Sequence, residues 1–272
     1  MDLTSKKVVK SLLKKHKISP QKQFGQNFLI DKLALKKVLL AAEIKPNETI
    51  LEIGPGIGTL TKELAKKAEK VIAVEKDRKM IEILKETLKD FKNVKILEKD
   101  ILKIKELEIK DYKVVANLPY YVVSPIIRKF LESMKIRPKY MILMVQKEVA
   151  QRITAKQRMN LLAVSVQFYA QAKIIGYVPK KSFWPEPKVD GAIIKLEVKK
   201  EKLKVDKDSF FKIVKAGFSQ PRKQLINNLS KELKVSREKV NEWLLKNNIE
   251  PTQRAETLSI ENWIKLTKNY TI

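Results

Sequence analysis

Short runs of apolar, largely β-branched residues alternate along the chain with segments in which apolar positions recur every three or four residues. The short runs have the length of buried strands, and the longer pattern is typical of amphipathic helices. We predict helices between strands that span residues 49–53, 71–75, 94–97, 112–116, 140–145, 173–178 and 192–198. This alternation indicates an α/β fold, in which helices cover both faces of a parallel sheet.

The pattern changes after residue 199, where a lysine-rich stretch precedes helical periodicity. We predict the last helices near residues 210–218, 224–229, 240–246 and 260–268. We therefore expect two domains, an α/β domain over residues 1–200 and a small all-helical domain over residues 201–272.

The first 26 residues form a basic N-terminal extension of the first domain. Within it, residues 3–17 place Val8, Val9, Leu12 and Leu13 on one helical face and lysines on the other. Such a helix can pack on its own domain, lie on a membrane surface or contact RNA. Packing on the domain is the commonest of these arrangements.

The 272 residues include no Cys and a single His, His16. These counts exclude a disulfide framework, a thiol nucleophile, a Cys-ligated metal centre and a site built from several His ligands. We therefore expect no metal. No apolar stretch approaches the roughly 20 residues of a membrane-spanning helix, so we expect a cytoplasmic protein that does not contact membranes.

The formal net charge is +27, from 58 Lys and Arg against 31 Asp and Glu. Nucleic acid is the first partner to consider for such a chain, because Lys and Arg displace counterions from phosphates. A lysine-rich genome composition or adaptation to heat gives the same excess. Charge alone leaves these alternatives open.

A glycine turn follows the first predicted strand of the alternating pattern, with Gly54, Gly56 and Gly58 before a helix. In open parallel sheets ligands bind at such turns, because glycine lets the backbone approach them closely. Glu75 ends the next strand and Asp100 follows the third, where carboxylates can accept from ribose hydroxyls and an adenine amine. In the alternative interpretation the glycines form only a tight strand-to-helix connection, and Glu75 and Asp100 cap helices or lie at the surface.

Together these residues predict a cofactor that contains a nucleoside. The turn departs from the Gly-x-Gly-x-x-Gly fingerprint of nicotinamide cofactors, and no Walker-type phosphate loop is present. S-adenosylmethionine requires only a carboxylate site, ribose contacts and an adenine slot, and it therefore remains compatible with the turn.

The fourth strand ends in a second turn, Asn117-Leu118-Pro119-Tyr120. Pro119 restricts Leu118 to extended backbone and so directs its carbonyl. The Asn117 oxygen and the Leu118 carbonyl can each accept a hydrogen bond from an exocyclic adenine amine, while Tyr120 stacks on the ring. An ordinary β-turn with a core tyrosine is the alternative. Phe183 opens a loop with two prolines and can cover the other face of the base, or simply brace a strand.

These motifs, together with FGQNFL at 24–29, QKE at 146–148 and FWPEPKVD at 183–190, resemble the ribosomal RNA adenine dimethyltransferases. More narrowly, they are similar to the members that dimethylate two adjacent adenines near the 3′ end of 16S rRNA. The resemblance continues through FSQPRK at 218–223 and RAE at 254–256, and it covers about residues 22–260.

The resemblance implies a Rossmann-like methyltransferase domain and a helical domain that recognises 16S rRNA, within the small ribosomal subunit or its precursor. It implies a monomer that uses S-adenosylmethionine. The cofactor contacts that it implies are Asn27, Leu29, Gly54, Gly56, Glu75, Asp100 and Asn117. The target-base site that it implies consists of Asn117, Leu118, Pro119 and Tyr120, with Phe183 stacking opposite.

Three other functions would use much of the same pattern. They are methylation of large-subunit rRNA of the macrolide-resistance type, methylation of adenine in DNA, and a non-enzymatic role in ribosome assembly. Residues 154–163 are shorter than is usual in the family, and Pro221 replaces a common basic residue. Both departures concern the RNA-contact surface rather than the reaction.

Overall fold

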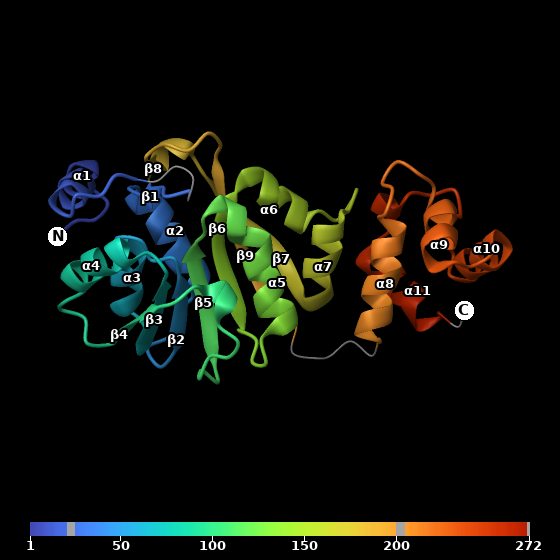
Figure 1. Ribbon diagram of the computed structural model, residues 1–272, viewed down its shortest axis with the longest axis horizontal. Coiled ribbons are helices and arrows are strands. Elements are labelled where there is room, and N and C mark those ends of the chain that lie inside the picture. Colours follow the sequence, from blue (N-terminus) through green and yellow to red (C-terminus); the bar gives the residue numbers. More distant parts are fainter. Residues whose placement is uncertain (21–24, 200–204, 271–272) are drawn as a thin grey trace. The chain divides into compact units, whose positions relative to one another are not determined.

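The computed structural model describes residues 1–20, 25–199 and 205–270, and the backbone alone at Tyr120 (Figure 1). The chain forms two compact units. The first consists of Met1–Ala150 and Gln171–Val198, and the second of Gln151–Ala170 and Lys199–Ile272. The division that we expected, between residues 200 and 201, lies outside the described residues. The difference from our expectation is the segment Gln151–Ala170, which we had placed in the first domain.

Aromatic packing explains why this segment belongs to the second unit. The Phe168 ring on α7 (Leu161–Tyr169) lies 4.2 Å from that of Phe210 on α8 (Lys207–Gly217), between centroids. The neighbouring Tyr169 ring stacks on Phe211 at 5.9 Å. Aromatic pairs at these distances add stabilisation beyond the area that they bury. Hydrophobic periodicity predicts α7 as a helix but does not reveal its partner.

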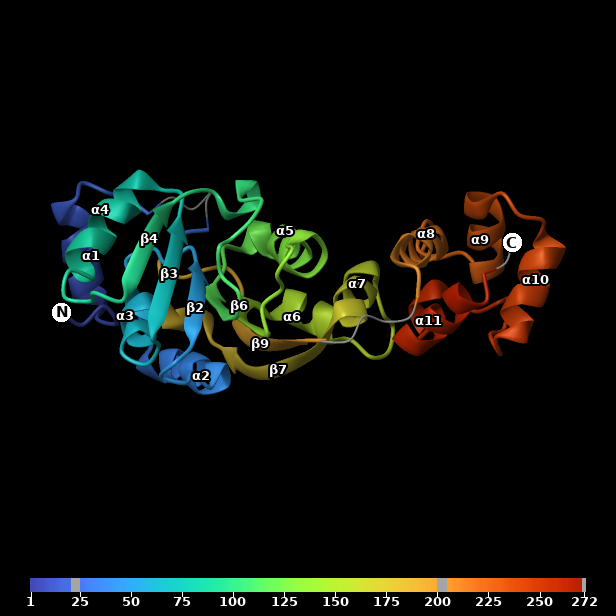
Figure 2. The ribbon, with the colours of Figure 1, turned by 90° about the horizontal axis from the view of Figure 1, so that it is seen from below.

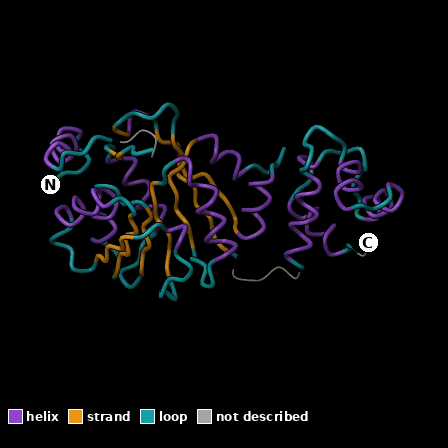
Figure 3. The backbone as a smooth tube through the Cα atoms, in the orientation of Figure 1, coloured by secondary structure: helices purple, strands orange, loops and turns teal. Residues whose placement is uncertain are grey.

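The first unit contains a seven-stranded sheet, drawn in orange in Figure 3. Neighbouring pairs among the five strands from β4 to β6 run parallel, and β9 runs antiparallel to β6. All seven predicted strands are confirmed. In sheet order they are β4 (Val94–Glu98), β3 (Lys70–Glu75), β2 (Thr49–Ile53), β5 (Tyr112–Asn117), β6 (Tyr140–Gln146), β9 (Gly191–Val198) and β7 (Ala170–Val178).

Helices cover both faces of this sheet, as the alternating pattern predicts. Figure 2 shows α2 (Lys32–Ala42) and α3 (Thr59–Ala65) on one face and α5 (Val123–Arg128) on the other. The side chain of Asp31 caps α2 by accepting from the backbone N–H groups of Leu33 and Ala34. This part of the chain also contains α4 (Arg78–Thr87), a π-helical turn (Lys129–Ser133) and α6 (Lys147–Thr154).

The basic N-terminal segment forms helix α1 (Lys6–Lys15), which packs on its own domain. This is the arrangement that we considered commonest for such a helix. The apolar cluster beneath α1 also holds residues that line the cavity described below. The cluster contains Leu3, Val9, Leu12, Leu13, Phe28, Ile57, Met80 and Ile83.

The second unit is helical where the structure describes it, as predicted. Besides α7 and α8 it contains α9 (Leu225–Leu233), α10 (Arg237–Lys246) and α11 (Ile260–Lys268). Phe210 and Trp263 are fully buried in its core. None of the helices in the described part of the chain is long and apolar enough to cross a membrane.

A buried lysine ties α2 to the sheet. The Nζ of Lys113, on β5, donates to the carbonyls of Ala42 and Glu43 at 3.0 and 2.8 Å, and it lies 2.8 Å from a carboxylate oxygen of Glu48. The lysine therefore satisfies carbonyls at the C-terminal end of α2 and pairs with a carboxylate at the same time.

We expect Lys113→Met to destabilise the first unit, because it leaves the Glu48 carboxylate and two carbonyls without their cation. Breaking a buried pair of this kind costs about 3 kcal/mol, measurable by urea denaturation. Lys139→Met is the matched control, since Lys139 pairs with Asp111 at the surface. This control should leave the unfolding midpoint nearly unchanged. Equal losses from the two substitutions would contradict the role given to Lys113.

Candidate active site

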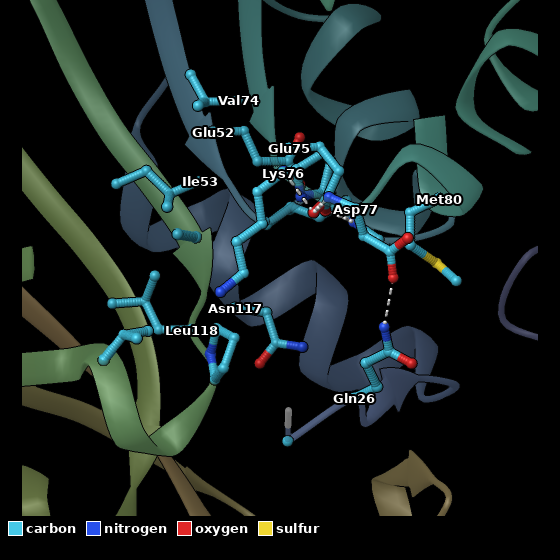
Figure 4. Close-up of a pocket in the computed structure, with 18 of the residues that line it drawn as sticks. Gln26, Glu52, Ile53, Val74, Glu75, Lys76, Asp77, Met80, Asn117 and Leu118 are labelled. Carbon is cyan, nitrogen blue, oxygen red and sulfur yellow. Dashed lines mark hydrogen bonds between the residues drawn. The ribbon is translucent and has the colours of Figure 1, made fainter. Parts of the chain in front are cut away.

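A cavity of about 650 Å³ lies at the ends of the central parallel strands. Its size is that of a small-molecule site. Figure 4 shows residues of β2, β3 and β5 and their following turns around it. Ten of the eleven predicted site residues line this cavity, namely Asn27, Leu29, Gly54, Gly56, Glu75, Asp100, Asn117, Leu118, Pro119 and Phe183. The eleventh is Tyr120, whose side chain lies outside what the structure describes.

The glycine turn adopts a backbone that only glycine accepts at low cost. Gly54 and Gly56 have φ values of +65° and +58°. The N–H of Gly54 donates to the Val74 carbonyl at 3.0 Å, which holds the turn against β3. A Cβ atom on Gly54 would lie 4.0 Å from the Pro119 ring, in the direction of the second predicted turn. The two turns therefore lie close together, and a side chain at residue 54 would extend toward Pro119.

Backbone donors hold the Glu75 carboxylate in one orientation. Its Oε1 accepts from the N–H groups of Lys76 and Asp77 at 2.8 and 2.9 Å, and its Oε2 accepts from Gly56 at 3.3 Å. Burial raises the pKa of Glu75, and these three donors act in the opposite direction. Oε2 retains the capacity to accept from a hydroxyl of a bound molecule.

Asp100 has the capping role that we considered for it, and it also lies where it can contact a ligand. One oxygen, Oδ1, caps the short helical turn Ile101–Lys103 by accepting from the Leu102 N–H at 2.9 Å. The residue also lines the cavity. A capping carboxylate is fixed in direction, and its second oxygen remains a possible acceptor for an amine.

Asn117 ends β5 and points into the cavity between Leu118 and Gln26 (Figure 4). Its Nδ2 donates to the carbonyl of Asn27 at 3.3 Å. This contact assigns the amide orientation and leaves Oδ1 as the acceptor that is offered to a ligand. The Leu118 N–H donates to the Met144 carbonyl at 3.1 Å, which fixes the peptide that precedes the Leu118 carbonyl.

A small sheet that we did not predict positions Asn27, Leu29 and Phe183. Strand β1 (Phe28–Leu29) pairs antiparallel with β8 (Phe183–Trp184), and Leu29 is opposite Phe183. Phe183 is only 3% exposed and belongs to the apolar core, although it also lines the cavity. The two-residue strands are too short to give a periodic signal, and they join segments about 150 residues apart.

Gln26 forms a second link across this edge of the cavity. Its Nε2 donates to a carboxylate oxygen of Asp77 at 3.1 Å, the contact drawn as a dashed line in Figure 4. Asp77 also caps α4 by accepting from the Lys79 N–H. The run that contains Asn27 is thereby joined to the N-terminus of α4.

Glu52 lines the cavity, although we did not predict it as a site residue. It lies on β2, is 2% exposed, and its Oε2 has no hydrogen-bond partner among the described residues. Burial raises the pKa of Glu52 to about 8, and the neighbouring Glu75 carboxylate acts in the same direction. The signal was available in the sequence, since an acidic residue inside an apolar strand needs an explanation.

Glu52→Gln tests this buried acid. The unfolded chain loses the Glu52 proton near the ordinary pKa of 4.5, whereas the folded chain keeps it to about pH 8. Glu52 therefore lowers stability increasingly as the pH rises between these values. We expect the Glu52→Gln variant to gain stability over the wild type from pH 5 to 8, by at most on the order of 4 kcal/mol, and to keep that gain above pH 8.

Thermal denaturation across this pH range measures the gain. Glu98→Gln is the matched control, because Glu98 is exposed and pairs with Arg78 at the surface. A gain from Glu52→Gln that does not change with pH would show that Glu52 is ionised in the folded protein.

Known proteins resemble this chain over nearly its whole length. A family model described as ribosomal RNA adenine dimethylase matches residues 5–271. A protein of Dehalococcoides mccartyi (strain CBDB1), named ribosomal RNA small subunit methyltransferase A, is 43% identical over 268 residues, which are 96% of this chain and 92% of that protein. The protein of the same name from Clostridioides difficile (strain 630) is 43% identical over 274 residues, at 96% and 94% coverage.

Solved structures agree with this relationship. The crystal structure of the 23S rRNA methyltransferase ErmE has a TM-score of 0.74 and 26% identity, and the match covers 89% of this chain and 99% of that one. A dimethyladenosine transferase from Plasmodium falciparum has a TM-score of 0.74 and 27% identity, at 87% and 94% coverage. The chain belongs to the ribosomal RNA adenine dimethylase family.

Proposed function

We propose that this protein transfers methyl groups from S-adenosylmethionine to the exocyclic amines of two adjacent adenosines near the 3′ end of 16S rRNA. The products are dimethyladenosines, formed during biogenesis of the small ribosomal subunit. The observation that carries the proposal is the orientation of Asn117, whose amide oxygen is offered to the cavity while its nitrogen is held by Asn27. The names of the relatives, which refer to the small subunit, support the choice of rRNA.

The residues around the cavity fit S-adenosylmethionine. Glu75 offers a fixed carboxylate for ribose hydroxyls, and Asp100 offers a second carboxylate for the adenine amine. Gly54 and Gly56 allow the close backbone approach that a nucleoside cofactor needs. Asn27 and Leu29 complete the wall on the side of β1. When bound, S-adenosylmethionine supplies an activated methyl group.

The chain's own contribution to the reaction is to orient the target amine. An aryl amine is a poor nucleophile because its lone pair is delocalised into the ring. Asn117 Oδ1 and the Leu118 carbonyl accept hydrogen bonds from the two N–H groups of the amine. These contacts favour the amine geometry in which the nitrogen lone pair points at the methyl group. We assign the two faces of the base to Tyr120 and Phe183, as the family resemblance implies. No titrating base is required, since the methylated amine becomes acidic enough to lose its proton to solvent.

The substrate is expected to be a ribosomal particle rather than free RNA of any sequence. We propose that the protein acts as a cytoplasmic monomer on the small subunit or its precursor, with the helical unit contributing to RNA recognition. The +27 net charge supports a partner rich in phosphate.

Methylation of the large subunit is the second candidate, because ErmE is as similar in structure as the Plasmodium enzyme. Incubating the protein with unmodified small and large subunits, followed by mass analysis of the RNA, separates the two functions. We expect two dimethyladenosines, four methyl groups in total, in 16S rRNA and none in 23S rRNA. Methylation of 23S rRNA alone, of duplex DNA in preference to particles, or of no nucleic acid would refute the proposal.

Replacing Asn117 tests the site within the same assay. Asn117→Ala removes one of the two acceptors, and we expect kcat to fall by roughly 10²- to 10³-fold, while affinity for the particle changes little. Asn93→Ala is the control, because the Asn93 amide donates to the carbonyls of Ala65 and Ala68 and does not line the cavity. Unchanged turnover in the Asn117→Ala variant would show that the amine binds elsewhere.

A further inference from the structure

An exposed tyrosine follows the target-base turn directly. Tyr121 is 50% exposed and lines the cavity together with Asn117, Leu118 and Pro119. It lies in the short helical turn Tyr120–Val122, which begins at the end of the base-binding segment. A tyrosine suits such a position, because its ring can contact a ligand while its hydroxyl stays in water.

A lysine from the neighbouring strand end holds the hydroxyl of this tyrosine. The Nζ of Lys76 donates to the Tyr121 Oη at 3.2 Å and lies 5.7 Å from the ring centroid. The ammonium is farther from the ring centre than from the hydroxyl oxygen by nearly the distance between those two points. It therefore lies beyond the hydroxyl, near the line from the ring centre through the oxygen, and so close to the ring plane. The ammonium therefore does not cover either face of the Tyr121 ring.

The position of Lys76 joins the cofactor side of the cavity to the target side. Lys76 follows Glu75 at the end of β3, and Figure 4 shows the two residues side by side above Asn117. Its ammonium contacts the Tyr121 hydroxyl and interacts electrostatically with the Asp100 and Glu75 carboxylates.

We propose that Tyr121 and Lys76 form a subsite for the nucleotide next to the target adenosine. The Tyr121 ring stacks on the neighbouring base, and the Lys76 ammonium contacts the phosphate that links the two nucleotides. Proteins that bind single-stranded RNA combine aromatic faces and cations in this way. The inference rests on the proposed function, because it presumes that adjacent adenosines are the substrate.

The spacing of the residues supports this assignment. Tyr121 is four residues beyond Asn117 and directly follows the target-base segment, within the short helical turn Tyr120–Val122. A base in the target site has to leave the stack of its helix, which exposes the neighbouring base as well. A second stacking surface beside the first then stabilises the opened RNA and holds one adenosine while the other is methylated.

Tyr121→Leu removes the stacking surface and keeps apolar bulk. We expect the KM for unmodified small subunits to rise roughly 5- to 100-fold, while the affinity for S-adenosylhomocysteine, measured by calorimetry, stays within about twofold of the wild type. Tyr121→Phe keeps both ring faces and should behave nearly as the wild type does. Lys76→Met should weaken particle binding and reduce the slope of log affinity against log salt by about 1.

The chain offers a matched control at Tyr177, on strand β7. This tyrosine is 48% exposed and has the Lys147 ammonium 5.3 Å from its ring, but it does not line the cavity. Tyr177→Leu should change the KM much less than Tyr121→Leu. Equal losses from the two substitutions, no loss from Tyr121→Leu, or a parallel loss of S-adenosylhomocysteine affinity would overturn the subsite.

Small subunits in which the adenosine beside the target is replaced by uridine complete the test. Uracil stacks more weakly, so the penalty for Tyr121→Leu should shrink on these particles if the ring contacts that base. A full penalty on both substrates would place the effect elsewhere. The wild-type enzyme is measured in parallel, and its failure to methylate unaltered particles would count against the proposed function rather than against the subsite.

Discussion

The parallel alignment of β2, β3 and β5 is the constraint on which the functional site depends. Because these strands run in the same direction, their carboxyl ends meet at one edge of the sheet, where the glycine turn, Glu75 and Asn117 lie around one cavity. The Lys113 contact fastens α2 to the same strands. The sheet thereby brings together turns that are far apart in the sequence.

Hydrogen bonds then fix the orientation of the side chains around this cavity. Backbone N–H groups occupy part of the Glu75 carboxylate, and the Asn27 carbonyl takes the Asn117 amide nitrogen. These contacts leave Glu75 Oε2 and Asn117 Oδ1 available as acceptors for a ligand. The chemistry supported by such a site is orientation by acceptors and stacking, which agrees with a chain that contains no Cys and one His.

Much of this was predictable from the sequence because it depends on local pattern. Strand periodicity located all seven strands of the main sheet, and residues that follow strand ends located most of the cavity. Features that depend on tertiary contacts were not predicted, namely the pairing of β1 with β8 and the packing of Gln151–Ala170 on the second unit. Glu52 was not predicted as a site residue because it lies within the strand before the glycine turn, and its raised pKa depends on burial in the folded protein.

The most direct test of this account is a crystal structure of the protein with S-adenosylhomocysteine and an adenosine nucleotide bound. We expect the adenine amine within hydrogen-bond distance, about 2.7–3.2 Å, of both Asn117 Oδ1 and the Leu118 carbonyl, with the Asn117 nitrogen still donating to the Asn27 carbonyl. An amine bound away from this pair, or an Asn117 side chain turned so that its nitrogen faces the base, would contradict it.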